Sequence, residues 1–190
     1  MERLVQTTYV EMTEPSQAIP PNGDKRLVVH RAEIPCPEVC RFFFMAVGND
    51  WWWYSRREWT REQWIEHAER EDRQTWIGSL DGTPMGYFEL AFRPDDEVEI
   101  LFFGLLPSFI GRGCGREFLA AAIDAAWQAN PSRVWLHTCD LDHPRALDNY
   151  LAAGFQIFKT TEEFETLPDQ PLEFWTHTPP WNPRPGRSSD

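Results

Sequence analysis

The feature of this sequence that most constrains its fold is a glycine-rich loop between two apolar segments of different periodicity. Residues 107–116 read Pro-Ser-Phe-Ile-Gly-Arg-Gly-Cys-Gly-Arg. The largely apolar run from Val98 to Leu106 precedes this loop, and the apolar residues between Phe118 and Trp127 recur at helical spacing. We therefore expect the chain to pass from a strand through a tight loop into a helix, with the glycines at the junction.

The position of these glycines also predicts an anion site. The first turn of a helix has N–H groups without intrahelical partners, and glycines let a phosphate approach the backbone closely. The loop is not a Walker loop, because no Lys-Ser or Lys-Thr follows its last glycine. Arg116 also stands where a dinucleotide fingerprint starting at Gly111 needs a glycine. A tight turn with a helix cap is the alternative reading of the same pattern.

Strand and helix signals cover most of the remaining chain. Asp81-Gly82 lies between two strand-like runs and indicates a hairpin, while Thr60 with Gln63 forms a capping box at a helix start. A strand, a helix and a second strand in succession predict a parallel strand pair. We expect strands over Leu4–Met12 (an edge strand), Leu27–Ala32, Thr75–Leu80, Met85–Phe92, Glu97–Leu106, Arg133–Thr138, Phe155–Glu163 and Leu172–Thr176, and helices over 37–47, 61–70, 113–129 and 144–153.

The length and composition of the chain favour one globular domain. A chain of 190 residues with 42% hydrophobic content can bury one sizeable core. We expect this domain to span residues 1–178. Residues 179–190 contain several prolines, which predicts an extended or disordered tail.

The charge and the cysteines limit the partners and the compartment. A net charge of −12 disfavours nucleic acid and anionic membranes, and the apolar runs are too short to span a bilayer. Four cysteines are too few to staple a domain of this size, so we expect reduced thiols and a cytoplasmic protein. We expect no metal site. Cys36 and Cys40 lack a second close pair, and the group His137, Cys139 and His143 lacks a fourth ligand.

A second motif follows the glycine loop and carries a family resemblance. Residues 143–155 read His-Pro-Arg-Ala-Leu-Asp-Asn-Tyr-Leu-Ala-Ala-Gly-Phe. With the loop, they resemble the GCN5-related N-acetyltransferases (GNAT), whose pyrophosphate loop reads Arg/Gln-x-x-Gly-x-Gly/Ala and whose later helix reads Asn-x-x-Ala-x-x-x-Tyr-x-x-x-Gly-Phe. The matching residues are Gly113, Gly115, Ala146, Tyr150, Gly154 and Phe155. Ile110 and His143 depart from the pattern, and the resemblance covers about residues 73–165.

The resemblance implies a fold and a co-substrate. The fold is an α/β domain of the α+β type, with a mixed, mostly antiparallel sheet, helices on both faces, and one parallel strand pair splayed around the cofactor. The co-substrate is acetyl-CoA. The residues expected to contact it are Phe103 and Leu105 through their backbone, Ile110, Gly111, Arg112, Gly113, Cys114, Gly115 and Arg116 in the loop, and His143 at the Asn position.

Two residues are the candidates for proton transfer. By resemblance, Glu99 is the base, directly or through water, and Tyr150 protonates the coenzyme thiolate. On periodicity alone, Glu99 can instead face solvent and Tyr150 can be a packed aromatic. Strand alternation puts Glu99 on the face opposite Val98, Ile100 and Phe102. Glu89, on the neighbouring strand, is the second candidate base and a candidate acceptor contact.

Four consecutive aromatic residues are the candidates for the acceptor wall. Trp51, Trp52, Trp53 and Tyr54 cannot all face inward on a regular element, so some should line a pocket or an interface. The resemblance implies an acceptor wall, because the segment that links the first two helices often lines the acceptor site in that family; a homodimer contact and plain packing are the alternatives. Aromatic faces and an acidic chain favour a small-molecule or peptide amine, and a cationic one in particular.

Together these observations predict an acetyl-CoA-dependent N-acetyltransferase that acetylates a primary amine by direct attack in a ternary complex. The alternative is a non-catalytic acyl-CoA-binding or sensing module of the same fold, which the departures at Ile110 and His143 motivate.

Overall fold

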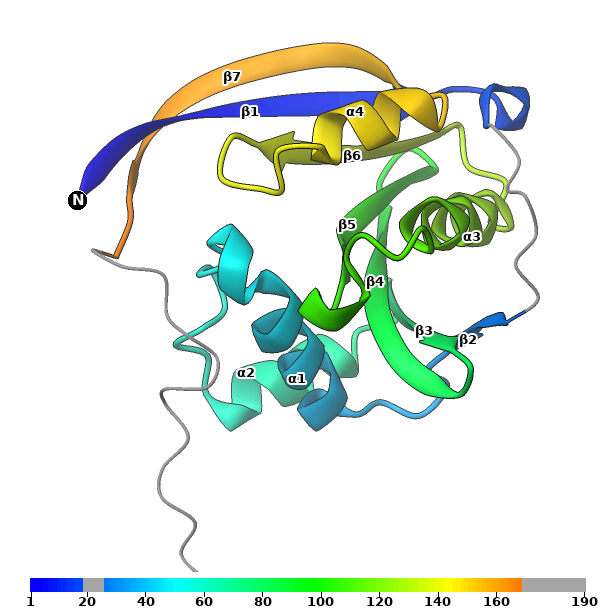
Figure 1. Ribbon diagram of the computed structural model, residues 1–190, viewed down its shortest axis with the longest axis horizontal. Helices are drawn as coiled ribbons and strands as arrows, with labels where there is room; N and C mark the ends of the chain where they lie inside the picture. The colour runs from blue at the N-terminus through cyan, green and yellow to red at the C-terminus, as the bar shows by residue number, and fades with distance from the viewer. Residues whose placement is uncertain (19–25, 169–190) are drawn as a thin grey trace, which may run out of the picture.

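The computed structural model describes residues 1–18 and 26–168, which form one mixed sheet with helices on both faces (Figure 1). Within the described residues the sheet has seven strands in the order β2-β3-β4-β5-β6-β1-β7. Neighbouring strands are antiparallel except for β5 and β6, which confirms the predicted sheet with one parallel pair. The strands are β1 (Glu2–Met12), β2 (Leu27–Arg31), β3 (Arg73–Leu80), β4 (Thr83–Arg93), β5 (Glu97–Leu105), β6 (Arg133–Cys139) and β7 (Gln156–Thr166), and the helices are α1 (Pro37–Gly48), α2 (Arg61–Ala68), α3 (Gly115–Trp127) and α4 (Ala146–Ala152).

Apolar side chains cover both faces of the sheet. On one face, Phe118 of α3 packs against Phe88 of β4 with ring centroids 5.5 Å apart, and both side chains are fully buried. Tyr150 of α4 belongs to the same apolar cluster. On the other face, Phe44 of α1 and Trp64 of α2 pack together with ring centroids 5.7 Å apart. The sheet therefore separates a face covered by α3 and α4 from a face covered by α1 and α2.

The parallel pair of β5 and β6 is short. Its register runs from Glu97 opposite Arg133 to Glu99 opposite Trp135, whereas β5 continues to Leu105 and β6 to Cys139. The two strands are therefore no longer paired with each other beyond Glu99. This is the splayed pair that the family resemblance implied. The unpaired stretch between the two strands, called the interval below, borders both faces of the sheet.

A β-bulge lies in β5 directly after this pairing ends. Leu90 of β4 is opposite Ile100, but its neighbour Glu89 is opposite Phe102, so one extra residue stands in β5. The extra residue reverses the alternation of side chains. Phe102 packs on the α1 and α2 face, in the cluster of Phe44 and Trp64. The prediction that Phe102 shares a face with Ile100 is therefore wrong, because simple alternation does not contain the bulge.

Strand β1 lies inside the sheet and not at its edge. It pairs with β6 from Thr7 to Met12 and with β7 along its other side. The predicted edge position is wrong, because β7 adds to the outer side of β1. Figure 1 shows this N-terminal strand between the yellow β6 and the orange β7, far from β2.

Several local predictions are confirmed. The Thr60 side chain accepts from the backbone N–H of Gln63, and the Gln63 side chain accepts from the backbone N–H of Thr60, as a capping box requires. Asp81 and Gly82 join β3 to β4 with φ of 49° and 80°. Gly154 ends α4 with φ of 107°, and a Cβ at this residue would lie 1.9 Å from the carbonyl oxygen of Gln17.

Some of the expected features lie in residues that the structure does not describe. The strand expected over Leu172–Thr176 and the tail at 179–190 lie outside the described residues. In residues 1–18 and 26–168, no helix combines the length and the apolar character that a membrane crossing needs.

Candidate active site

The glycine loop joins β5 to α3 and exposes its backbone. Gly111 and Gly113 have φ of 80° and 83°, and an added Cβ at either residue would meet no atom within 4 Å. Helix α3 begins at Gly115, and its N-cap residue Cys114 provides no side-chain hydrogen bond to the first turn. The N–H groups of this turn also lack acceptors within the helix. The open space and the donors together fit an anionic group such as a phosphate.

The other loop residues have separate roles. Arg112 donates from Nε to the carbonyl oxygen of Ser108 at 2.6 Å, and its guanidinium lies 5.7 Å from the Phe109 ring centroid. Arg116 is exposed in the first turn of α3. Ile110 is also exposed, so the residue that departs from the family pattern presents no charge to the loop. Positive charge here comes from the two arginines.

Three predicted residues line the α3 and α4 side of the interval between β5 and β6. The Phe103 ring lies 6.5 Å from that of Tyr150, and both pack with the core on this face. Leu105 approaches the first turn of α3, with its Cδ1 3.5 Å from where a Cβ of Gly115 would lie. Beyond Glu99, the groups of β5 that face β6 have no strand partner among the described residues. They are therefore placed as the predicted backbone contacts require.

Burial raises the affinity of the Tyr150 phenol for its proton. The side chain is almost fully enclosed, and this burial, with the nearby charge of Asp142, raises the pKa of the phenol. The hydroxyl is therefore protonated at neutral pH and can act as a proton donor.

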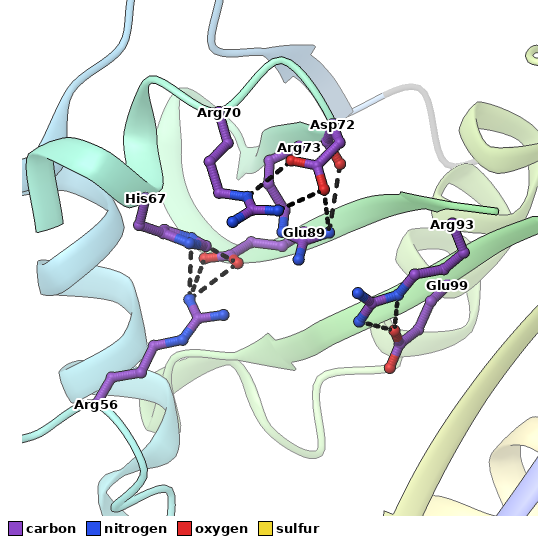
Figure 2. A network of polar contacts seen from close by, with 8 residues as sticks. All are labelled: Arg56, His67, Arg70, Asp72, Arg73, Glu89, Arg93 and Glu99. Atoms are coloured by element: carbon purple, nitrogen blue, oxygen red, sulfur yellow. Dashed lines mark hydrogen bonds and ion pairs between the residues drawn. The ribbon is translucent and has the colours of Figure 1, made fainter. Parts of the chain in front are cut away.

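Glu99 is buried and ionised. Its side chain is 2% exposed, and Arg93 donates to its Oε2 from Nε at 2.7 Å and also from Nη2 (Figure 2). Its Oε1 lies 3.4 Å from Nδ1 of His137. Burial raises the pKa of Glu99, but hydrogen bonds from His137 and Arg93 outweigh it and lower the pKa overall. The solvent-facing alternative is therefore wrong, while the role of Glu99 as base stays a prediction.

Glu89 belongs to a buried ion cluster. Its Oε2 lies 3.1 Å from Nη1 of Arg56 and 3.0 Å from Nε2 of His67 (Figure 2). Arg56 itself packs over the rings of Phe102 and Trp59, at 4.4 and 4.8 Å from their centroids. Burial raises the pKa of Glu89, but the hydrogen bond from His67 and the charge of Arg56 outweigh it and lower the pKa overall. An acceptor would reach Glu89 only if this cluster opened.

The aromatic run connects the end of α1 to the loop between β6 and α4. Trp53 packs on Phe102 with ring centroids 4.9 Å apart and donates from Nε1 to Oδ1 of Asp142 at 3.3 Å. Trp53 therefore connects the C-terminal half of β5 to the loop between β6 and α4.

The other residues of the run pack nearby. The Trp51 ring lies 4.9 Å from that of His143, which accepts through Nδ1 from the backbone N–H of Arg145. Trp52 and Tyr54 pack on a small cluster under β1, and the Tyr54 hydroxyl donates to Glu165. The contacts of Trp52 and Tyr54 are those of the packing alternative. His143, which was expected to contact the coenzyme, therefore lies against Trp51, which was expected to contact the acceptor.

Two residues of this region escaped the sequence-based site prediction. The first is His137, which was considered above only as a possible metal ligand, and whose Nδ1 lies 3.4 Å from Oε1 of Glu99. The second is Asp142, which accepts from the Thr138 hydroxyl at 2.7 Å, from the backbone N–H of Cys139 at 3.1 Å and from Trp53. Strand alternation from Arg133 could have placed His137 beside Glu99, but only once the register of β5 against β6 was known.

No metal centre joins these groups: residues 1–18 and 26–168 contain no cluster of three or more His, Cys, Asp or Glu arranged to hold an ion. The site thus combines an open glycine loop and a buried tyrosine on one face with a carboxylate, a histidine and a tryptophan on the other.

The class that this fold and site define is that of the acetyltransferases. A model of the acetyltransferase (GNAT) family matches residues 44–155, which is more than half of the chain. The chain belongs to this family, and the resemblance seen in the two motifs is confirmed.

Solved structures share the fold at low sequence identity. A GCN5-related N-acetyltransferase from Sphaerobacter thermophilus matches with a TM-score of 0.66 and 15% identity, over 90% of this chain and 55% of that chain. One from Kribbella flavida gives 0.62 and 17%, over 86% and 59%. The spermidine N-acetyltransferase from Vibrio cholerae, in complex with CoA and spermine, gives 0.57 and 14%, over 74% and 93%.

This chain therefore spans less than two thirds of the length of the Sphaerobacter and Kribbella proteins. A comparison with curated protein sequences gives no match.

Proposed function

We propose that this protein is an N-acetyltransferase that transfers an acetyl group from acetyl-CoA to a primary amine by direct attack in a ternary complex. One observation carries the proposal: the pairing of β5 and β6 ends at Glu99, after which β5 leads on to the glycine loop, and charged and aromatic side chains lie on the α1 and α2 face. Such an opening lets a thioester and an amine meet from opposite faces of the sheet.

Acetyl-CoA is the co-substrate, and it supplies the activated acetyl group as a thioester. The N–H groups at the start of α3 and the open space over Gly113 hold its phosphates, with Arg112 and Arg116 adding positive charge. The unpaired edge of β5 at Phe103 and Leu105 offers N–H and C=O groups to the pantetheine arm, as an added strand would use them.

Tyr150 completes the transfer from the coenzyme side. The attacking nitrogen forms a bond to the carbonyl carbon as the carbon–sulfur bond breaks, and charge develops on sulfur. Tyr150 donates its proton to that sulfur. The raised pKa of its phenol keeps this proton in place until the thiolate forms.

We propose a cationic amine as the acceptor. The chain has 30 acidic and 18 basic residues, and the similar Vibrio cholerae structure contains the polyamine spermine. Trp53 borders the interval between the strands on the acceptor side, and an aromatic face attracts an ammonium group.

Steady turnover tests the proposal against the non-catalytic alternative. The purified protein is given acetyl-CoA and a panel of mono-, di- and polyamines, and free thiol is followed with time. Thiol release that depends on the amine supports the enzyme. Acetyl-CoA binding in calorimetry without thiol release for any amine favours a binding or sensing module, which the exposed Ile110 at the Arg/Gln position motivates.

A further inference from the structure

We propose that His137 accepts the proton of the attacking amine and that Glu99 is its positioning residue. This inference rests on the proposed acetyl transfer and deepens it. It gives the proton-accepting role to a side chain of β6 instead of the glutamate of β5.

Glu99 has no face free for an acceptor. Its side chain is 2% exposed, Arg93 binds Oε2 twice, and Oε1 faces Nδ1 of His137 at 3.4 Å. An amine could reach this carboxylate only by displacing the arginine or the imidazole. A carboxylate held in this way orients and stabilises a neighbouring group rather than exchanging protons with substrate.

His137 has the access that Glu99 lacks. Its side chain is 43% exposed, and it stands on β6 two residues past Trp135, the last residue paired with β5. Its neighbour Leu136 packs in the core on the α3 and α4 face, so alternation puts the imidazole on the α1 and α2 face, where the two strands begin to separate. This is the face from which the amine enters in the proposed function.

The contacts of the ring determine which nitrogen is available. With Nδ1 carrying its hydrogen toward Glu99, the neutral imidazole presents the lone pair of Nε2. The Tyr9 ring lies 5.6 Å away on one side, and the Trp135 ring lies 6.5 Å away. The Glu99 carboxylate and the two aromatic neighbours thus fix the orientation of the imidazole ring. The orienting carboxylate of a Ser-His-Asp triad has the same effect on its histidine.

The charges around His137 come from five strands and are largely paired. Arg93 of β4 is paired with Glu99 of β5. Arg133 of β6 is paired with Glu97 of β5 and with Glu11 of β1. Lys159 of β7 lies over the Tyr9 ring at 4.8 Å. These ion pairs leave the imidazole beside a balanced set of charges, so a cationic amine can approach it.

His137, Tyr150 and solvent together account for every proton in the proposed reaction. The ammonium form of the acceptor gives one proton to Nε2 of His137, which passes it to solvent. The freed nitrogen attacks the thioester carbonyl, the new C–N bond forms, and the C–S bond breaks. Tyr150 donates to the departing sulfur and regains a proton from the nitrogen of the adduct. The products are the amide and free CoA thiol, with one proton released.

The test uses His137→Gln, with His30→Gln as the matched control. His30 is an exposed histidine on β2, at the opposite edge of the sheet. We measure kcat/KM against pH for a strongly basic amine and for a weakly basic amine that is uncharged at the assay pH, and acetyl-CoA affinity by calorimetry. A proton acceptor contributes about 10²–10⁴-fold, so His137→Gln should lose about a hundredfold or more with the basic amine.

Two further results should accompany that loss. It should shrink for the uncharged amine, and acetyl-CoA affinity should stay unchanged. Glu99→Gln should show the same dependence on amine basicity with a smaller loss. His30→Gln should match the wild type.

Failure of this role and failure of the proposed function give different results. A wild-type protein without amine-dependent thiol release overturns the proposed function and this role with it. An active wild type with equal losses for both amines, or with no loss in His137→Gln, overturns the role of His137 alone. If His137→Gln does not bind acetyl-CoA, His137→Asn repeats the comparison, and equal losses for both amines there also refute the role.

Discussion

The buried cluster of Arg56, His67 and Glu89 gives the prediction with the largest expected effect on stability. Glu89 is 1% exposed and the Arg56 side chain is 9% exposed, with Nη1 and Oε2 3.1 Å apart. Glu89→Gln leaves the guanidinium without its counter-charge in a site closed to water. Removing one partner of a buried ion pair costs about 3–5 kcal/mol. We expect the lower end, about 3 kcal/mol, because Arg56 also packs over Phe102.

The measurement is the free energy of unfolding from urea denaturation, together with the melting temperature. For a chain of this size about 3 kcal/mol corresponds to a decrease of about 6–12 °C in Tm. Glu38→Gln is the matched control, because Glu38 pairs with Arg61 at 3.6 Å while both side chains are largely exposed. An exposed pair contributes less than about 1 kcal/mol. Equal destabilisation by the two substitutions would refute the reasoning.

The same cluster predicts a pH dependence of stability. The pKa of Glu89 in the folded protein is lowered, because His67 and Arg56 outweigh the effect of burial. A carboxyl group with a lowered folded pKa stabilises the fold above its unfolded pKa, and this stabilisation is lost as the pH falls through the folded value. The gap in unfolding free energy between wild type and Glu89→Gln should therefore narrow below about pH 4. A gap that stays constant on acidification would contradict this assignment.

Three further predictions concern the proposed reaction. Gly113→Val should abolish acetyl-CoA binding in calorimetry because a branched side chain would fill the open space over the loop; Gly82→Val, at a turn glycine with φ of 80° and equal open space, should keep it. Tyr150→Phe should lower kcat about a hundredfold with little change in acetyl-CoA affinity; unchanged kcat, with chemistry shown to be rate-limiting, would reduce Tyr150 to packing. A diamine should give a higher kcat/KM than a matched monoamine, by an amount that salt reduces; equal values at low and high salt would refute the cationic acceptor.

Local signals determined much of this fold. The capping box at Thr60, the Asp81-Gly82 turn and the glycine loop act over a few residues, so each can be read from neighbouring letters. The order of strand, helix and strand around the loop likewise predicted the parallel pair. The helix returns the chain to the end of the sheet where the first strand began, so the second strand runs in the same direction. The loop could therefore be placed between a strand and a helix from the sequence, while the coenzyme role of the loop and of Tyr150 stays a prediction from the family resemblance.

The acceptor side was decided by contacts between residues far apart in the chain. The bulge in β5 turned Phe102 toward α1, and β7 covered the edge of β1. Alternation within one strand cannot report an extra residue, and a strand alone does not specify its partners. The pairings of Glu99 with His137 and of Trp53 with Asp142 join segments 38 and 89 positions apart. Such pairings depend on register and packing, so the sequence could name the charged and aromatic residues, but only the tertiary structure decided which of them meet.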